Sequence, residues 1–176
     1  IDPANAYLSV ASRLLDNTVL HRRIREQGGA YGGGSSNKMS SGKFCFYAYR
    51  DPNLASTLEA FKLAIHHIEK GDFSDRELEE AKLGIIQKLD HPISPEYQGI
   101  TAYSWQQEGK VDAVRQSLRS HILNAEKKHI QQAVSQHLRD RFEEAVTVSF
   151  ASKSAIEEEN KKLKNKKLAP LQTIPI

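Results

Sequence analysis

The sequence RIREQGGAYGGGSS, residues 23–36, joins a helical pattern to strand-like sequence and holds half of the chain's ten glycines. A glycine-rich loop can bind a phosphate, but the dinucleotide-binding fingerprint needs glycines at positions one, three and six. From each possible first glycine, at least one of these positions falls on another residue, and no Gly-Lys-Ser/Thr of a P-loop follows. A phosphate loop also runs from strand to helix, whereas this stretch runs from helix to strand. The stretch is therefore predicted to end a helix at Gly28 and Gly29 and to begin a strand.

Apolar residues recur at helical spacing on both sides of this junction. The Asp-Pro pairs at 2–3 and 51–52 are each typical of an N-cap followed by a proline at the first helical position. Residues 74–77, Ser-Asp-Arg-Glu, form a capping box. The predicted helices cover residues 3–27, 52–70, 75–91, 95–108, 111–123 and 125–141, and a further one begins after Ser152.

Runs rich in aromatic and β-branched residues predict three strands. Residues 30–35 and 43–49 are predicted to pair as a hairpin across a polar turn at 37–42, and residues 145–151 form the third strand. The predicted fold class is α+β, with an antiparallel sheet packed by several helices. Three strands make a thin sheet for so many helices, which leaves two interpretations: a mostly helical protein with a small sheet, or a fold truncated at its N-terminal strands. We favour the second, in which partner strands lie upstream of Ile1.

Length and composition indicate one domain, residues 1–168, followed by a tail at 169–176. The formal net charge of +3 is small, and much of the positive excess lies in a lysine-rich run at 161–167 rather than among aromatics, so no nucleic-acid partner is expected. No apolar run approaches ~20 residues, so no membrane partner is expected either. The chain opens without methionine or a signal peptide, and we expect it to be a piece of a longer protein.

Seven histidines and one cysteine prompt a search for a metal or nucleophile site. The helical zinc motif His-Glu-x-x-His is absent, and its inverted form is nearly met from His66 to Glu69 but ends on Lys70, which cannot bind zinc at neutral pH. His137 is predicted to pack on an apolar helix face. Cys45 is predicted to be a buried or half-buried thiol inside a strand, and a lone cysteine favours a reducing compartment. No metal site is predicted in this chain.

Arg25 and Tyr31 lie on the two sides of the glycine turn. One interpretation is structural: an arginine near a helix C-terminus interacts favourably with the helix dipole, and glycines cap the helix. In the functional interpretation, the turn directs an arginine and a phenol to one point, where they hold a peptide carbonyl or carboxylate. Gly28 and Gly29 would then leave room for a substrate backbone to bind. The spacing alone leaves both interpretations open.

A family resemblance favours the functional interpretation. Residues 20–34, LHRRIREQGGAYGGG, closely resemble the C-terminal part of presequence-protease-like zinc metallopeptidases, a branch of the pitrilysin and insulin-degrading-enzyme family. The resemblance continues at FYAYRDP (46–52), LEAF (58–61), EEAKLG (79–84) and Ser-Pro (94–95), and it covers residues 1–150. It implies an enzyme of four related α+β domains, arranged as two bowl-shaped halves that close around an unfolded peptide. This chain resembles the last domain, and the zinc motif belongs to the first.

By this resemblance, Arg25 and Tyr31 are catalytic residues that reach across the closed chamber to the scissile bond, and Gly28 and Gly29 bind substrate. Zinc is expected in the full-length enzyme and not in this chain, which by itself is expected to be inactive. The expected partners are a peptide substrate and the remaining domains of the parent chain, and the fragment is expected to self-associate through an uncovered sheet edge. The expected location is a bacterial cytoplasm or an organelle matrix.

Two other classes of function stay open. Related family members serve as non-catalytic scaffold subunits, although the presence of both Arg25 and Tyr31 argues against that class. A basic-tailed binding module for acidic partners would depend on residues 161–167. This run follows the three glutamates at 157–159 and alternates in sign along one helix, which is typical of a solvated helix face.

Overall fold

The computed structural model describes residues 2–165 and 170–172. It confirms the α+β class, with helices packed beside a two-stranded antiparallel sheet in this part of the chain. The predicted tail at 169–176 and the end of the lysine-rich run fall partly outside the described residues. The elements are α1 (Pro3–Leu15), β1 (Gly32–Lys38), β2 (Lys43–Tyr49), α2 (Leu54–Lys70), α3 (Asp75–Leu89), α4 (Pro95–Gln107), α5 (Asp112–Leu123), α6 (Lys127–Val134) and α7 (Lys153–Asn165).

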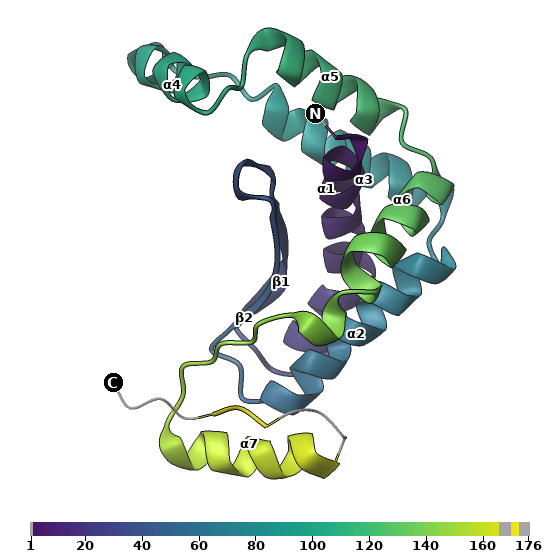
Figure 1. The fold of residues 1–176 in the computed structure, drawn as a ribbon, viewed down its shortest axis with the longest axis vertical. Helices are drawn as coiled ribbons and strands as arrows, with labels where there is room; N and C mark the ends of the chain where they lie inside the picture. The colour runs from purple at the N-terminus through teal and green to yellow at the C-terminus, as the bar shows by residue number, and fades with distance from the viewer. Residues whose placement is uncertain (1, 166–169, 173–176) are drawn as a thin grey trace.

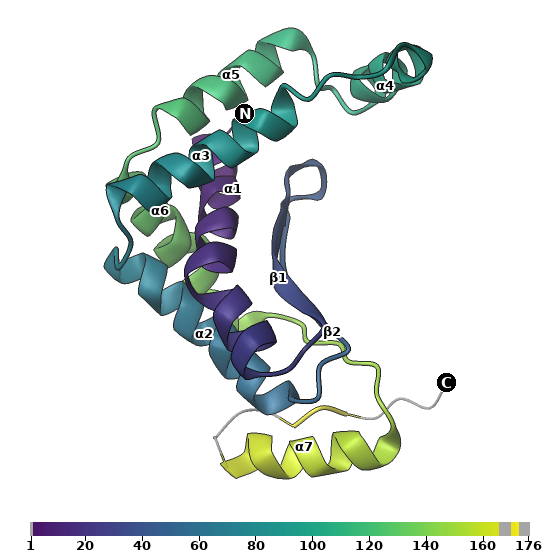
Figure 2. The same ribbon diagram turned by 180° about the vertical axis from the view of Figure 1, so that it is seen from behind.

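The helices form a curved layer with the hairpin of β1 and β2 on its inner side (Figure 1). Helix α1 is central, because it contacts β1 as well as α2, α3, α5 and α6. Figure 2 shows α4 projecting from one end of the layer and α7 lying across the other. In the described part of the chain, none of the helices combines the length and the apolar character that crossing a bilayer requires.

The first helix starts and continues as predicted. The Asp2 carboxylate accepts a 2.9 Å hydrogen bond from the Ala4 N–H, and Pro3 occupies the first turn. After Leu15 the helix widens into a π-helical segment, Asp16–Gln27, which the sequence did not predict. Apolar residues of both parts are buried in the core, including Val10, Leu14, Leu15, Leu20 and Ile24. The predicted helix over 3–27 is therefore one continuous element with two geometries.

The hairpin is confirmed, with β1 displaced by a few residues from the predicted strand. In its register Gly32 pairs with Tyr49, Ser35 with Phe46, and Lys38 with Lys43. The Phe46 ring packs on Phe61 of α2 at a centroid distance of 4.9 Å. One aromatic face of β2 thus joins the core that the helices form.

Asp16 fastens the hairpin to the first helix. Its Oδ1 accepts a 2.7 Å hydrogen bond from the Ser35 N–H and a 2.9 Å bond from the Ser35 hydroxyl. Burial raises the pKa of Asp16, and the two hydrogen bonds from Ser35 oppose that rise only in part. A Cβ at Gly34 would lie 3.1 Å from the Asp16 carboxylate oxygens, so glycine lets the strand come this close.

The predicted third strand is wrong. Residues 145–150 form neither a strand nor a helix, and their alternating apolar side chains are exposed: Val146 by 90%, Val148 by 72% and Phe150 by 85%. Figure 1 shows the chain running here from the end of α6, past the base of the hairpin, to α7. A strand needs a neighbour for its backbone hydrogen bonds, and none of the described residues supplies one here.

Two helix predictions are corrected in detail. His137 is exposed and Leu138 is buried in its place, because a second π-helical segment, Ser135–Arg139, follows α6 and shifts the buried face. Helix α2 begins at Leu54, two residues later than the Asp-Pro pair predicts, with Asn53 as its N-cap. The Asp51 carboxylate instead accepts a 2.8 Å hydrogen bond from the Asn53 N–H, which makes a local turn before the helix.

The other cap predictions are confirmed. Ser74 and Glu77 exchange hydrogen bonds as a capping box at the start of α3. Gly71 ends α2 in the left-handed conformation at a φ of 75°. The Ser152 hydroxyl accepts a 3.3 Å hydrogen bond from the Ala155 N–H ahead of α7.

Candidate functional site

The glycine turn stops the long first helix through backbone geometry. The N–H of Gly29 donates to the carbonyl of Arg25 at 3.0 Å, and the N–H of Ala30 donates to that of Ile24 at 3.1 Å. A Cβ at Gly28 would lie 2.6 Å from the Ile24 carbonyl oxygen, and Gly29 adopts a φ of 77°. Both positions therefore favour glycine, one for space and one for conformation. The buried Ala30 then leads into β1.

The start of α2 holds this turn from the other side. The side-chain amide of Asn53 donates a 2.7 Å hydrogen bond to the carbonyl of Gly28. Asp51 in turn accepts from the Asn53 backbone and from the hydroxyl of buried Thr57. The turn is thus fixed to a second helix, which limits how far the side chains beside it can move.

Arg25 lies exposed on the last turn of the π-helical segment. Its Nη1 lies 3.0 Å from Nε2 of His21, one turn earlier. A guanidinium carries only donors, so Nε2 of His21 is the acceptor and the ring proton resides on Nδ1. That nitrogen lies 3.3 Å from Oε1 of Glu26. Glu26 and His21 therefore orient the guanidinium of Arg25.

Tyr31 lies on the other side of the turn, with 69% of its surface exposed. Its ring meets that of Tyr49 edge to face, with centroids 6.0 Å apart and planes at 81°. The guanidinium of Arg50 lies 5.7 Å from the centroid of the Tyr31 ring and 5.4 Å from that of Tyr49. An exposed phenol beside an arginine can donate a hydrogen bond to an incoming carbonyl oxygen.

The structure thus places the four predicted site residues, Arg25, Gly28, Gly29 and Tyr31, at one exposed turn. It gives Arg25 and Tyr31 different partners, and among the described residues no hydrogen bond joins the two. The supporting residues of the turn, His21, Tyr49, Arg50 and Asn53, were not predicted from the sequence. Only His21 carried a local signal, its four-residue spacing from Arg25 on a helix.

The described residues do not fit a zinc ion. They bring together no group of three or more histidine, cysteine or acidic side chains that could hold a metal. His66 pairs with Glu69 at 3.7 Å, and His67 pairs with Asp72 at 3.8 Å, each beside a single carboxylate. Cys45 is half-buried in β2, as predicted.

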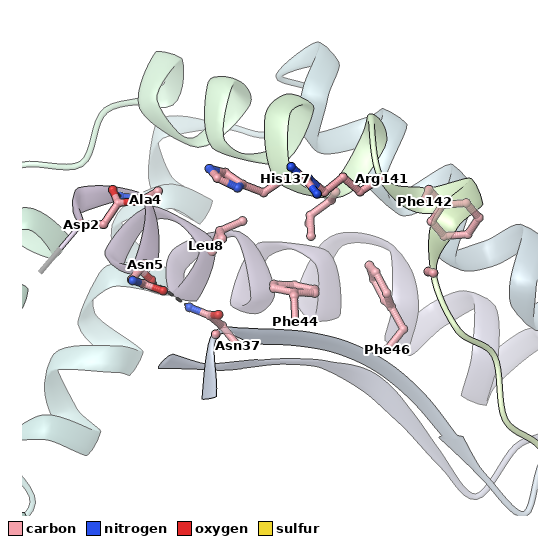
Figure 3. A pocket seen from close by; sticks show the side chains of 13 residues that line it. Asp2, Ala4, Asn5, Leu8, Asn37, Phe44, Phe46, His137, Arg141 and Phe142 are labelled. Atoms are coloured by element: carbon pink, nitrogen blue, oxygen red, sulfur yellow. Dashed lines mark hydrogen bonds between the residues drawn. The ribbon is translucent and has the colours of Figure 1, made fainter. Parts of the chain in front are cut away.

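A separate groove of about 450 Å³ lies between the hairpin, α1 and the chain that follows α6. In Figure 3, Phe44 and Phe46 point from the hairpin into the groove, which Leu8 and Phe142 also line. Asn37 closes one end by donating a 2.9 Å hydrogen bond to the carbonyl of Asn5. The groove is mainly apolar, and Arg25 and Tyr31 do not line it.

Comparison with known proteins gives one consistent result. Residues 2–153 match the family model described as the PreP C-terminal domain. The chain is 41% identical over 138 residues to the mitochondrial presequence protease of Aspergillus fumigatus, which covers 78% of this chain and 13% of that protein. It is 36% identical over 167 residues to the presequence protease of Emericella nidulans, covering 95% and 16% of the two chains, and 37% identical over 121 residues to that of Mus musculus, covering 69% and 11%.

The chain therefore spans about a sixth or less of the length of these relatives. The family model nevertheless covers most of this chain, including the glycine turn, the hairpin and the helices up to the start of α7. This chain belongs to the presequence protease family and carries its C-terminal domain.

Proposed function

We propose that this chain is the C-terminal domain of a zinc metalloendopeptidase of the pitrilysin type that degrades unfolded peptides. The observation that carries the proposal is the exposed turn at which Arg25 and Tyr31 flank two glycines. The turn is held by Asn53 on one side and by the hairpin on the other. The relatives of this chain are named as proteases, which supports a protease as the parent protein.

In the proposed reaction Tyr31 donates a hydrogen bond to the oxygen of the scissile carbonyl, where negative charge builds up in the transition state. Arg25 binds a backbone carbonyl or a carboxylate of the peptide, in the orientation that His21 gives it. Gly28 and Gly29 form the turn on which the peptide backbone is proposed to bind, and the Cβ direction of Gly29 meets no atom closer than 4.0 Å, so that side of the turn is open to it. Because the described residues offer no fitting ligand cluster, the zinc of the proposed enzyme is assigned to other domains.

The proposed partners are an unfolded peptide and the remaining domains of the parent chain, and we propose no nucleic acid or membrane partner. The relatives carry the word mitochondrial in their names and come from fungi and animals, which favours an organelle matrix over a bacterial cytoplasm. A non-catalytic scaffold of the same fold is the alternative. Two side chains poised at an exposed turn support the enzyme, because a scaffold has no need of them.

Tyr31→Phe in the full-length protein tests the proposal. Removing only the hydroxyl keeps the ring beside Tyr49, so folding and KM should change little while kcat falls roughly a hundredfold. Tyr103→Phe is the matched control, since Tyr103 is also exposed but lies on α4. A full-length protein that cleaves no unfolded peptide would favour the scaffold, and a Tyr31→Phe enzyme with normal kcat would remove the role given to Tyr31.

Residues 1–176 alone are expected to retain no stoichiometric zinc and to cleave no peptide. Metal analysis after zinc addition and desalting, together with a fluorogenic peptide assay, measures both. One tightly held zinc per chain, or cleavage that a chelator stops, would contradict the assignment of zinc to other domains.

A further inference from the structure

Arg50 departs from the strand that precedes it. Strand β2 ends at Tyr49, and Arg50 takes a φ of 48°, the one positive φ of a non-glycine residue in the described part of the chain. In an extended strand, successive side chains point to opposite faces. The left-handed conformation instead lets the guanidinium of Arg50 lie 5.4 Å from the ring centroid of the adjacent Tyr49. A long side chain adopts this conformation only at a cost in free energy, so the surrounding structure must hold it there.

The same residue contacts Tyr31 in two ways. Its guanidinium lies 5.7 Å from the Tyr31 ring centroid, and its carbonyl accepts a 3.3 Å hydrogen bond from the Tyr31 N–H. The Tyr31 and Tyr49 rings meet edge to face, so one cation lies against both members of a perpendicular pair. The backbone hydrogen bond fixes the position of the Tyr31 main chain, and the ring contacts restrict the direction of its side chain.

We propose that Arg50 is a positioning residue that acts through Tyr31 by holding the phenol in the direction needed to meet the substrate carbonyl. This rests on the function proposed above for Tyr31. Tyr31 is largely exposed, so few other contacts restrain its ring. Without the guanidinium the ring would sample other rotamers, and the hydroxyl would spend less time where the oxyanion forms. The effect should appear in kcat, because substrate capture does not depend on this one hydroxyl.

The test uses the full-length protein with Arg50→Ala, Arg50→Gly and Arg50→Lys, assayed with a fluorogenic unfolded peptide. Arg50→Gly removes the side chain from a residue type that adopts a positive φ freely, so it separates loss of the guanidinium from backbone strain. We expect both truncations to lower kcat about tenfold with KM within about twofold, and Arg50→Lys to recover part of the loss through its cation. Arg115→Ala is the matched control, since Arg115 lies 3.9 Å from the Trp105 ring centroid in the α4–α5 region and should leave kcat unchanged.

A double variant shows whether Arg50 acts through Tyr31. Adding Arg50→Gly to Tyr31→Phe should lower kcat no further, because the hydroxyl to be positioned is already gone. NMR of ring-labelled tyrosine in residues 1–176, with the Tyr31 signal assigned by its loss in Tyr31→Phe, should show that signal moving in Arg50→Gly and not in Arg115→Ala.

The outcomes separate the two proposals. A slow Tyr31→Phe enzyme together with Arg50 variants of normal kcat would overturn the positioning role and leave the function of Tyr31 intact. Additive losses in the double variant, or an unmoved Tyr31 ring signal, would also overturn it. A Tyr31→Phe enzyme with normal kcat would instead remove the function on which the positioning role depends.

Discussion

The side-chain amide of Asn53 donates a 2.7 Å hydrogen bond to the carbonyl of Gly28, so the first residue of the glycine turn and the N-cap of α2 are joined across 25 positions of sequence. Gly28 ends one helix and Asn53 begins another. This bond therefore sets how the two helices meet beside Arg25 and Tyr31.

Asn53→Ala should lower the free energy of unfolding by about 1–2 kcal/mol, because it leaves the half-buried carbonyl of Gly28 without its donor. Denaturant unfolding measures the change. Asn124→Ala is the control, since the Asn124 amide makes an exposed 3.3 Å contact with Ser120 and its loss should cost less than about 0.5 kcal/mol. Equal losses in the two variants would show that Asn53 does not fix the turn.

Three glycines of the same stretch should differ in their tolerance of alanine. Gly28→Ala places a methyl group 2.6 Å from the Ile24 carbonyl oxygen and should cost about 3 kcal/mol. Gly29→Ala meets no atom closer than 4.0 Å but must hold a φ of 77°, which should cost about 1–2 kcal/mol. Gly32→Ala meets nothing within 4 Å and should stay within about 0.5 kcal/mol of the parent chain.

The order of the three free energies of unfolding is the result to check, because it depends on the turn geometry and not on glycine content. If Gly32→Ala lowered the free energy of unfolding as much as Gly28→Ala, the stretch would depend on the backbone flexibility of all its glycines. The explanation that Gly28 and Gly29 end the helix through their local geometry would then be wrong.

The sequence predicted those parts of the fold that local chemistry determines. The capping box at Ser74 and the proline at the start of α1 act within one turn, and the hairpin depends on residues close in sequence. The turn between Arg25 and Tyr31 followed from the same kind of signal, since a glycine pair after a helix marks a turn, whereas the proposal of a site there came from the family resemblance. The strand predicted at 145–151 failed because alternation shows which residues can share a face but supplies no partner.

The residues that support the site could not be predicted from the sequence, for a physical reason. Nothing in the identity of Arg50 indicates a positive φ, and its place beside Tyr31 depends on the register that pairs Gly32 with Tyr49. The π-helical turns had no sequence signal either, and they moved His137 off the buried face. Contacts between distant segments decide these features, and spacing along the chain does not report them.

Glu159 of α7 should make stability depend on pH. Its side chain is 11% exposed, and its Oε2 accepts a 2.9 Å hydrogen bond from the Ala55 N–H at the start of α2. Burial acts to raise the pKa of Glu159, but the hydrogen bonds from Ala55 and Lys162 outweigh burial and hold the pKa below its ordinary value of 4.5. A lowered pKa means that the carboxylate stabilises the fold above pH 4.5 and that this stability is lost as pH falls through the folded-state pKa.

Glu159→Gln should therefore lower Tm at pH 7 by an amount equivalent to about 1 kcal/mol, and the difference from the parent chain should shrink as the pH falls below 4.5. Thermal unfolding across this pH range measures it. Glu157→Gln, at an exposed position of the same helix, should change Tm little at any pH. A Glu159→Gln deficit of constant size down to acid pH would mean that the charge is not the source of the stability.

The exposed segment at 145–150 should make the isolated chain self-associate. Val146, Val148 and Phe150 alternate in sequence with Thr147 and Ser149 and are each at least 72% exposed, and both outer edges of the two-stranded sheet lack a strand partner among the described residues. A segment with an unpaired backbone and exposed apolar side chains pairs readily with the free sheet edge of another chain. Sedimentation equilibrium of residues 1–176 should show a dimer or larger species. Replacing Val146 and Phe150 with lysine should shift the equilibrium toward monomer without lowering Tm, since neither side chain is packed.

Leu83→Lys is the control, because Leu83 is 62% exposed but lies on α3, where no backbone group is free to pair. A parent chain that stays monomeric at high concentration, or association that Leu83→Lys abolishes equally well, would show that this segment is not the contact.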